Sequence, residues 1–318
     1  MAYTLENTLV IGISATALFD LSEADKLFKD ENKKHPDRAI DIYRQYMLDS
    51  ENIPLKEGIG FPLVKALLNL NRYQKESETP LVEVVIMSRN SPDTGVRVLN
   101  TIRELKLNIT RSVFTAGESS ADYLEAFDVD LFLTTNEDDA QKVIDNGVCA
   151  SAVLNTPPEY KCDIPEEQVR IAFDGDAVLF DESSELVYKE GGIEAFHDNE
   201  EKSQNIPMSE GPFAAFLKKL ACLQERLPMK MEFSPVRIAI VTARNAPSDL
   251  RVIKTLRHWG VYVDEAFFLG GIEKSKILQS FKAHIFFDDQ DVHLKHSSLV
   301  VPSGKVLYPS HSRLNKHI

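Results

Sequence analysis

The chain has 318 residues, a formal net charge of -13 and a pI near 5.1, with 43% apolar and 27% charged residues. A chain of this length forms one large domain or two of ordinary size, and its apolar content is sufficient for a buried core. The negative charge repels polyanions, so we expect no nucleic-acid partner, although a local cluster of donors can still bind one small nucleotide.

The cysteines and the apolar segments give an expectation for the cellular location. The three cysteines, Cys149, Cys162 and Cys222, are widely spaced and form no CxxC motif, which favours a reducing cytoplasm over a disulfide framework. The apolar run "TLVIGISATALF" is too short to span a bilayer and has no basic residues before it. We read this run as a buried strand with its exit loop, and expect a cytoplasmic protein without a membrane partner.

One stretch of the chain occurs twice. "IMSRNSPDTGVRVLNTIREL", from Ile86, resembles "VTARNAPSDLRVIKTLRHWG", from Val241. Further on, "FTAGESSADYLEAFDVDLFLTTNEDD" and "FLGGIEKSKILQSFKAHIFFDDQDV" match without a gap, and Arg97 and Arg251 keep the same separation. Pairing Arg89 with Arg244 requires one additional residue in the turn between. The unit is far too long for a solenoid repeat, so we infer a duplicated α/β domain.

A proline-rich segment separates the two copies. "NTPPEYKCDIPEEQ", residues 155–168, is the predicted linker between a half at 1–154 and a half at 169–318. In the second half, "VRIAF", "VRIAIV" and "AHIFF" are apolar runs typical of parallel strands buried on both faces, with helices expected over 211–226, 248–259 and 274–281. We therefore predict an α/β fold of two related Rossmann-like parallel-sheet halves, with ligands at the carboxyl ends of the strands.

Polar residues follow each of these three strands. They are Asp174-Gly175-Asp176, then Thr242-Ala243-Arg244-Asn245, then Asp288-Asp289, and Lys274 stands just before the third helix. Carboxylates that meet at one sheet edge raise one another's pKa unless a cation lies among them. A hard oxygen-ligand site for Mg²⁺ satisfies that requirement.

Such a cluster is suited to phosphoryl transfer. A carboxylate can attack the phosphorus of a phosphomonoester and form an aspartyl phosphate, while Mg²⁺ offsets the repulsion between the anions. A second carboxyl group can protonate the leaving alkoxide and then deprotonate water. Thr242 can donate a hydrogen bond to the phosphoryl group, and Lys274 supplies a compact positive charge.

These segments resemble a known family. "FDGDAVLF", "VTAR", the Lys274 segment and "FFDD" resemble, in this order, the four motifs of the haloacid dehalogenase superfamily of phosphatases. More narrowly, "RIAFDGDAVLFDESSELV", "VTARNAP", "LRVIKTLRHWG", "DEAFFLGG" and "HIFFDDQ" resemble the type I cytosolic 5′-nucleotidases. The upstream segments "ALFDL", "GFPLVKALLNLNR" and "GVRVLN" extend the resemblance over most of the chain.

The resemblance implies a role for each motif residue. Asp174 would be the nucleophile and Asp176 the general acid/base, whose backbone carbonyl also meets the metal. Thr242 and Lys274 would hold the phosphoryl group, and Asp288 with Asp289 would complete the Mg²⁺ shell. The implied substrates are nucleoside 5′-monophosphates, chiefly AMP. A nucleotide effector is a further candidate partner, because ADP activates the better-known members.

The resemblance leaves two alternatives open. One is a phosphatase for another small phosphomonoester, and the other is a nucleotide-sensing binding protein without turnover. This superfamily often inserts a cap between its first two motifs, and the segment available here, 181–207, is short. Neither the base preference nor the oligomeric state follows from the sequence.

The first half lacks the motif residues. The alignment places Ser14 at Asp174, Thr16 at Asp176, Met87 at Thr242, Ser120 at Lys274, and Thr134 and Thr135 at Asp288 and Asp289. We therefore expect a degenerate, non-catalytic half, whose Arg89 and Asn90 either stabilise a turn or contact the nucleoside or an effector. Arg244 and Asn245 likewise have two readings, as substrate contacts or as turn residues with Asn245 capping a helix.

Overall fold

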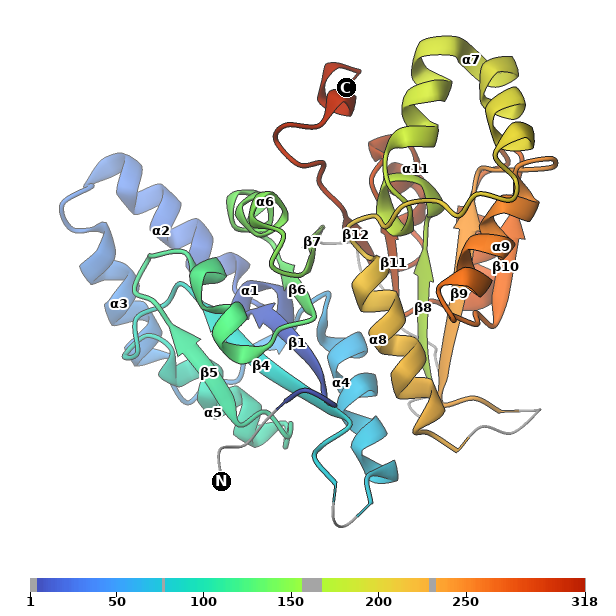
Figure 1. Cartoon of the computed structure of the whole chain (residues 1–318). Coiled ribbons are helices and arrows are strands. Elements are labelled where there is room, and N and C mark those ends of the chain that lie inside the picture. Colours follow the sequence, from blue (N-terminus) through green and yellow to red (C-terminus); the bar gives the residue numbers. More distant parts are fainter. Residues whose placement is uncertain (1–4, 76–77, 156–167, 229–232, 318) are drawn as a thin grey trace.

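The computed structural model describes residues 5–75, 78–155, 168–228 and 233–317 (Figure 1). Its centre is a ten-stranded sheet with helices on both faces, in the strand order β10-β9-β8-β11-β12-β7-β6-β1-β4-β5. This arrangement confirms the predicted α/β class. Most of the predicted linker, residues 156–167, lies outside the described residues.

Five strands of the large sheet come from the N-terminal half, the described residues up to 155. Its strands are β1 (Leu9–Ser14), β4 (Val82–Ser88), β5 (Arg111–Phe114), β6 (Leu131–Thr134) and β7 (Ala150–Leu154), with a small pair β2 (Phe19–Asp20) and β3 (Lys56–Glu57). Its helices are α1 (Ala15–Leu18), α2 (Ser22–Lys34), α3 (Ala39–Asp49), α4 (Phe61–Asn69), α5 (Val96–Glu104) and α6 (Glu137–Asn146), with 3-10 turns at Leu70–Tyr73, Ser120–Tyr123 and Glu125–Phe127.

The other five strands come from the C-terminal half, the described residues from 168 onward. They are β8 (Val169–Phe173), β9 (Val236–Thr242), β10 (Glu265–Phe268), β11 (Ile285–Asp288) and β12 (Ser303–Lys305). The helices are α7 (Ser183–Lys202), α8 (Ala214–Glu225), α9 (Asp249–His258), α10 (Ser275–Phe281) and α11 (Asp291–Ser297), with a π-helical turn at Gly175–Leu179 and a 3-10 turn at Arg313–Lys316. The three helices predicted in this half are thus present as α8, α9 and α10.

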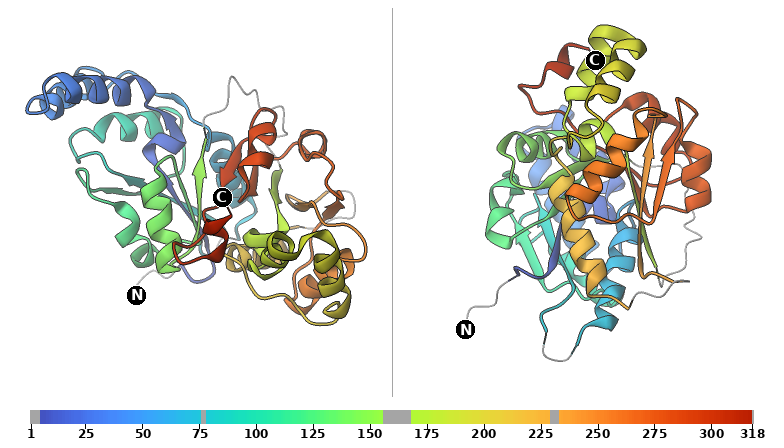
Figure 2. Two further views of the ribbon diagram at one scale, coloured as in Figure 1. Left: turned by 90° about the horizontal axis from the view of Figure 1, so that it is seen from above. Right: turned by 45° about the vertical axis from the view of Figure 1, so that its right-hand side comes forward.

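The two halves repeat one topology. Read from the outer edge inward, the strand order is β5-β4-β1-β6-β7 in the N-terminal half and β10-β9-β8-β11-β12 in the C-terminal half. Within each half, all strand pairs of the large sheet are parallel. The halves join where β7 and β12 pair antiparallel, with Val153 opposite Lys305. Seen from above, they lie side by side with the C-terminus between them (Figure 2).

The register of the strands corrects the predicted alignment. Ser88 lies opposite Phe114 on β5, as Thr242 lies opposite Phe268 on β10. The structural counterpart of Thr242 is therefore Ser88, and the prediction of Met87 at that position was wrong. Met87 precedes the end of the strand and points into the core, because side chains alternate between the faces of a strand.

The turn that follows contains no additional residue. The backbone N–H of Ala116 donates to the carbonyl of Asn90 (3.0 Å), and the N–H of Gly270 donates to the carbonyl of Arg244 (3.3 Å). Asn90 is therefore the counterpart of Arg244, and the predicted pairing of Arg89 with Arg244 was also wrong. The two identical Arg-Asn dipeptides are therefore shifted by one residue relative to each other in the structure. The sequence alignment placed a gap here in order to match them, whereas the equivalent hydrogen bonds require no gap.

The core joins the halves on one face of the sheet. There, a single apolar cluster includes Ile11 and Ile13 of β1, Phe173 of β8, Leu67 of α4 and Phe216 of α8. Helix α4 contacts β8 of the other half, and α8 contacts β1. The opposite face has one larger cluster in each half and a small one in which Ala140 and Val153 meet Leu307 of the other half. Strands buried on both faces explain the continuous apolar runs in the sequence.

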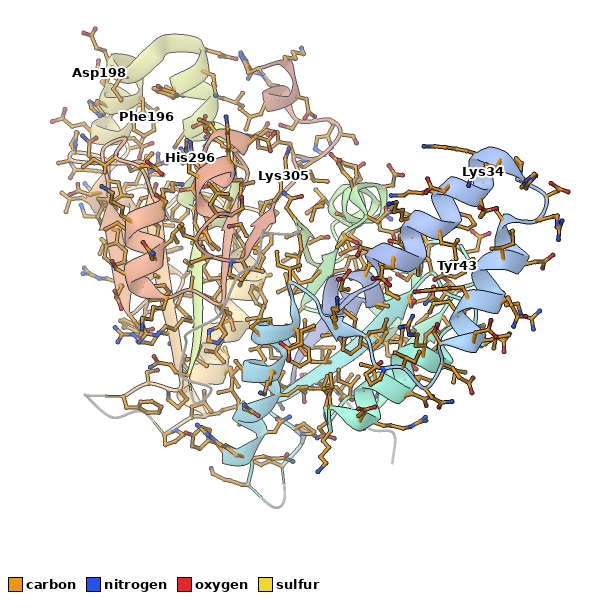
Figure 3. The ribbon with its side chains drawn as sticks, turned by 180° about the vertical axis from the view of Figure 1, so that it is seen from behind. Lys34, Tyr43, Phe196, Asp198, His296 and Lys305 are labelled. Atoms are coloured by element: carbon orange, nitrogen blue, oxygen red, sulfur yellow. The ribbon has the colours of Figure 1, made fainter. Side chains whose placement is uncertain are left out.

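A helical hairpin stands over the strand ends of each half. In the N-terminal half it is α2 with α3, entered and left through the β2–β3 pair. In the C-terminal half it is α7, which bends at Gly192 (φ 75°) and lies within the segment 181–207. The two hairpins occupy opposite sides of the molecule, marked by Tyr43 and Phe196 in Figure 3. None of the helices in the described ranges is long and apolar enough to cross a bilayer.

Candidate active site

The carboxyl ends of β8, β9 and β11 bring the predicted motif residues together. Asp174 follows β8, Thr242 ends β9, Asp288 ends β11, and Lys274 immediately precedes α10. All four are buried, with 4% or less of each residue exposed. The parallel sheet therefore assembles side chains that are far apart in the sequence at one edge, as the strand pattern predicted.

Lys274 lies between two carboxylates. Its Nζ is 2.9 Å from Oδ1 of Asp174 and donates to Oδ2 of Asp288 at 2.7 Å. These carboxylates raise the pKa of Lys274 although burial opposes the shift. Burial raises the pKa of Asp174 to about 6, with Lys274 opposing and Asp288 adding to the shift. The ammonium thus remains charged beside a carboxylate that is more basic than usual.

Two further groups bind the neighbouring carboxylates. Nδ1 of His293 lies 3.1 Å from Oδ2 of Asp288, and Lys274 and His293 hold the pKa of Asp288 below its usual value against the effect of burial. The hydroxyl of Tyr308 donates to Oδ2 of Asp289. Burial, followed by the charges of Asp288 and Asp174, raises the pKa of Asp289 well above its usual value. These carboxylates therefore form one electrostatic cluster.

This cluster fits a divalent cation. Asp174, Asp288 and His293 each offer a ligand atom, and the three atoms lie within 4.8 Å of one another. Oδ1 of the buried Asp289 has no hydrogen-bond partner, and Oδ1 of Asp174 has the Lys274 ammonium beside it without a well-formed hydrogen bond. A carboxylate-rich, buried donor set with unsatisfied oxygens is suited to Mg²⁺.

Thr242 lies against the turn that carries Asp174. A Cβ atom added to Gly175 would be 3.3 Å from Oγ1 of Thr242, so glycine permits this close approach. Oγ1 accepts a hydrogen bond from the backbone N–H of Arg244 at 3.3 Å, which leaves the hydroxyl hydrogen available for another acceptor. The hydroxyl is therefore positioned beside Asp174 as a donor.

Arg244 connects Asp176 to the hairpin above the site. Its guanidinium donates two hydrogen bonds to Asp176 (2.8 and 2.6 Å) and one to Oε2 of Glu200 (2.5 Å). Glu200, on α7, is fully buried and also accepts from Arg251 and Ser184. The guanidinium also lies over the ring of Phe196, 5.2 Å from its centroid. Arg244 thus positions Asp176 and anchors α7, a larger structural role than its sequence position indicated.

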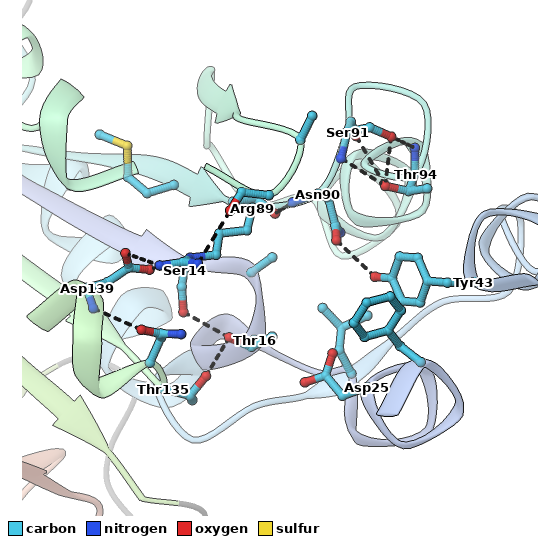
Figure 4. A pocket seen from close by; sticks show the side chains of 18 of the residues that line it. Ser14, Thr16, Asp25, Tyr43, Arg89, Asn90, Ser91, Thr94, Thr135 and Asp139 are labelled. Atoms are coloured by element: carbon cyan, nitrogen blue, oxygen red, sulfur yellow. Dashed lines mark hydrogen bonds and ion pairs between the residues drawn. The ribbon is translucent and has the colours of Figure 1, made fainter. Parts of the chain in front are cut away.

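The other predicted binding residues lie elsewhere. Asn245 is exposed, and its backbone carbonyl accepts from the N–H and hydroxyl of Ser248 in the turn before α9. Arg89 and Asn90 line a cavity in the N-terminal half, together with strand-end residues of that half (Figure 4). The structure therefore separates Arg89 and Asn90 from the cluster around Asp174.

Sequence reasoning missed His293, Tyr308 and Glu200. His293 stands in the first turn of α11, directly after β11, and its distance from Asp288 along the chain was the one available signal. Tyr308 and Glu200 reach the site from the C-terminal segment and from α7. These two contacts depend on tertiary placement, for which no local pattern exists.

Comparison with known proteins identifies the family of the chain. A family model described as 5′-nucleotidase matches residues 1–313. Human cytosolic 5′-nucleotidase 1B is 35% identical over 297 residues, covering 91% of this chain and 47% of the human protein, so the chain spans about half the length of this curated relative. No solved structure gives a significant match. The chain belongs to the 5′-nucleotidase family.

Proposed function

We propose that the protein hydrolyses nucleoside 5′-monophosphates, AMP foremost, to nucleoside and phosphate in a Mg²⁺-dependent reaction. The observation that carries this proposal is the buried group of Asp174, Lys274 and Asp288 at the ends of adjacent strands. Membership of the 5′-nucleotidase family supports the substrate class, and the name of the human relative supports a cytoplasmic location.

In the proposed reaction, Asp174 is the nucleophile. One of its carboxylate oxygens attacks phosphorus, the bond from phosphorus to the 5′-oxygen breaks, and Asp176 protonates the departing alkoxide. Asp176 then removes a proton from the water that attacks the aspartyl phosphate, which releases phosphate and restores Asp174. Both oxygens of Asp176 accept from Arg244, so one of these hydrogen bonds must break for Asp176 to carry the proton that it donates.

The remaining residues neutralise and hold the phosphoryl group. Lys274 contributes a buried positive charge, and the Thr242 hydroxyl donates to a phosphoryl oxygen. Asp174 and Asp288 would hold Mg²⁺, with the carbonyl of Asp176 and the carboxylate of Asp289 as further oxygen donors, while His293 orients Asp288. The bound ion would stabilise the negative charge that the phosphoryl group and the carboxylates bring together.

Chemistry is confined to the C-terminal half in this proposal. The strand-end positions of the N-terminal half have Ser14, Thr16 and Thr134 in place of carboxylates. Hydroxyl groups of serine and threonine neither hold Mg²⁺ in this way nor form an aspartyl phosphate. The N-terminal half would therefore be non-catalytic.

The test is phosphate release from AMP by the purified chain, with Mg²⁺ and with EDTA. We expect release with Mg²⁺, none with EDTA, and none from an Asp174→Asn variant whose circular dichroism matches the wild type. A panel of other nucleoside monophosphates and simple phosphomonoesters would rank substrates. Equal release in EDTA, full activity in Asp174→Asn, or AMP as the poorest substrate would contradict the proposal.

A further inference from the structure

The N-terminal half contains a cavity of about 690 Å³ at the carboxyl ends of β1, β4 and β6. Its volume is within the range of sites that bind small organic ligands. The lining includes Ser14, Thr16, Ser88, Asn90, Thr134 and Thr135 from the strand ends and their loops, and residues of α2 and α3 (Figure 4). No residue of the C-terminal half is among the lining residues in the described part of the chain.

This cavity is the counterpart of the candidate active site. The backbone N–H of Asn90 donates to Oγ of Ser88 (3.2 Å), as the N–H of Arg244 donates to Oγ1 of Thr242 (3.3 Å). A second match is the bond from Asn136 N–H to Oγ1 of Thr134 (3.0 Å), which corresponds to the one from Gln290 N–H to Oδ1 of Asp288 (2.8 Å). The backbone framework is thus retained.

The cavity differs from the active site in charge. Asp174, Asp176, Arg244, Asp288 and Asp289 have the neutral counterparts Ser14, Thr16, Asn90, Thr134 and Thr135. The hydroxyls of Ser14, Thr16 and Thr135 form a hydrogen-bonded chain (3.1 and 2.6 Å) where the other half gathers carboxylates. Within the described ranges, the one group of side chains arranged for a metal ion is in the C-terminal half. A phosphoryl group could approach these hydroxyls without a metal, because there is no cluster of carboxylates to repel it.

The ionised groups that line the cavity are balanced once the partner of Arg44 is counted. Lys29, Arg44 and Arg89 line the cavity together with Asp25 and Asp139. Arg89 donates two hydrogen bonds to Asp139 (2.9 and 2.6 Å), and Arg44 contacts Asp93. In a chain with a net charge of -13, a region without excess negative charge is locally favourable for an anion.

Asn90 supplies an unsatisfied donor. Its Oδ1 accepts from the hydroxyl of Tyr43 (2.9 Å), which fixes the orientation of the amide. Its Nδ2 is buried and has no hydrogen-bond partner. A buried donor without an acceptor is costly, so this amide group favours a ligand that offers an oxygen or a ring nitrogen.

The hairpin supplies an apolar wall opposite the hydroxyls. Phe28 of α2 and Tyr43 of α3 form an edge-to-face pair with ring centroids 5.8 Å apart, and Leu21 and Ile40 also line the cavity. Such a surface can pack against a flat heterocycle. The cavity therefore combines neutral donors on one side with aromatic surface on the other.

We propose that this cavity binds a nucleoside monophosphate without a divalent metal ion. The phosphoryl group lies at the hydroxyls of Ser14, Thr16 and Ser88, and the base lies against Phe28 and Tyr43, with an acceptor atom of the ligand facing Asn90. The inference takes the nucleotide class of its ligand from the proposed function. The metal-free mode of binding comes from the cavity itself.

The test is calorimetric titration of the full chain with AMP in EDTA, where the carboxylates of the other site repel the phosphate. We expect one binding site, weakened at least tenfold by Asn90→Leu and several-fold by Tyr43→Phe. Tyr46→Phe, on the same helix but outside the cavity lining, is the matched control and should bind as the wild type does. Lys274→Met should also leave binding in EDTA unchanged.

Adenosine and inorganic phosphate, titrated separately, should each bind more weakly than AMP. No binding of AMP in EDTA, binding unaffected by both Asn90→Leu and Tyr43→Phe, or adenosine binding as tightly as AMP would overturn the inference. Phosphate release from AMP with Mg²⁺, measured on the same preparation, tests the proposed function separately. If the protein releases phosphate from AMP but does not bind AMP in EDTA, only this inference is wrong. If it binds AMP in EDTA but releases no phosphate, only the proposed function is wrong.

Discussion

The two halves of the sheet have the same strand order and several matching backbone hydrogen bonds, yet their strand ends differ in charge. In the C-terminal half, Asp174, Lys274 and Asp288 are buried together in direct contact. In the N-terminal half, Ser14, Thr16 and Thr135 form a chain of neutral hydrogen bonds. The fold places side chains at this edge in either case, and the residue types at a few positions decide whether the edge can support metal-dependent chemistry.

Buried charges also affect stability differently from hydroxyls. Charged groups are expensive to remove from water and must be paired, so breaking one pair leaves an uncompensated charge. The C-terminal half compensates its charges through Lys274, Arg244 and Arg251. The N-terminal half has fewer buried charges that need a partner around its cavity. The comparison therefore predicts unequal effects of substitutions at matched positions.

The largest effect should come from the Lys274 and Ser120 pair. Lys274→Met removes a buried positive charge that contacts both Asp174 and Asp288, and should lower kcat/KM for AMP on the order of 10³-fold. Ser120, at the corresponding position, does not line the cavity, so Ser120→Ala should leave kcat/KM unchanged. Steady-state phosphate release measures both. A comparable loss of kcat/KM in the Ser120→Ala variant would contradict the proposal that only the C-terminal half is catalytic.

Arg244 and Asn90 offer a matched test of stability. Arg244→Ala leaves the fully buried Glu200 with one cation fewer and should lower the free energy of unfolding by about 3–5 kcal/mol. Asn90→Ala removes one neutral hydrogen bond, to Tyr43, and should cost about 1 kcal/mol. Urea denaturation followed by circular dichroism gives both values. Equal losses would show that the charge difference between the halves has no energetic consequence.

His284 and Asp130 occupy matching positions at the amino ends of β11 and β6 and should respond to pH in opposite directions. Each accepts a hydrogen bond from the backbone N–H of the strand beside it, of Arg170 (3.1 Å) and Val10 (2.8 Å) respectively. Burial, with Arg170, lowers the pKa of His284 to about 4, whereas burial raises the pKa of Asp130.

The sign follows from these shifts. A folded-state pKa below the unfolded value means that His284 stabilises the fold fully above about pH 6.5, and that this contribution is lost as the pH falls towards 4. The loss should reach about 3 kcal/mol. The raised pKa of Asp130 gives the opposite slope, with stability lost as the pH rises through that pKa. Urea denaturation between pH 7 and 4 should therefore show a shallower decline in His284→Asn, and an unchanged decline would refute the assignment.

The smallest effect should come from Tyr308. Its hydroxyl donates to Asp289 of the active half, and its backbone carbonyl accepts from Gln141 on α6 of the other half (2.9 Å). Tyr308→Phe removes one hydrogen bond and should reduce kcat about tenfold, with about 1 kcal/mol of lost stability. Ser310→Ala, which removes a bond from the same segment to Asp145, is the control and should keep wild-type kcat. Identical kinetics in both variants would place Tyr308 outside the site.

Apolar runs and motif order predicted the parallel sheet, the helices α8, α9 and α10, and the grouping of Asp174, Thr242, Lys274 and Asp288, because strand ends in a parallel sheet converge whatever lies between them. The register was not predictable from similar letters. Arg89-Asn90 and Arg244-Asn245 are identical dipeptides, yet the equivalent backbone hydrogen bonds show that Asn90 occupies the position of Arg244. The contacts of Tyr308 and Glu200 and the cavity under α2 and α3 also arise only when distant segments pack.

The central claim is that one half performs the chemistry, and trapping the covalent intermediate tests it most directly. The chain would be quenched during turnover of AMP with Mg²⁺, reduced with borohydride to convert any aspartyl phosphate to homoserine, and mapped by mass spectrometry. The account predicts modification of Asp174 and of no aspartate in residues 1–154. Modification within residues 1–154, or turnover without modification of Asp174, would contradict it.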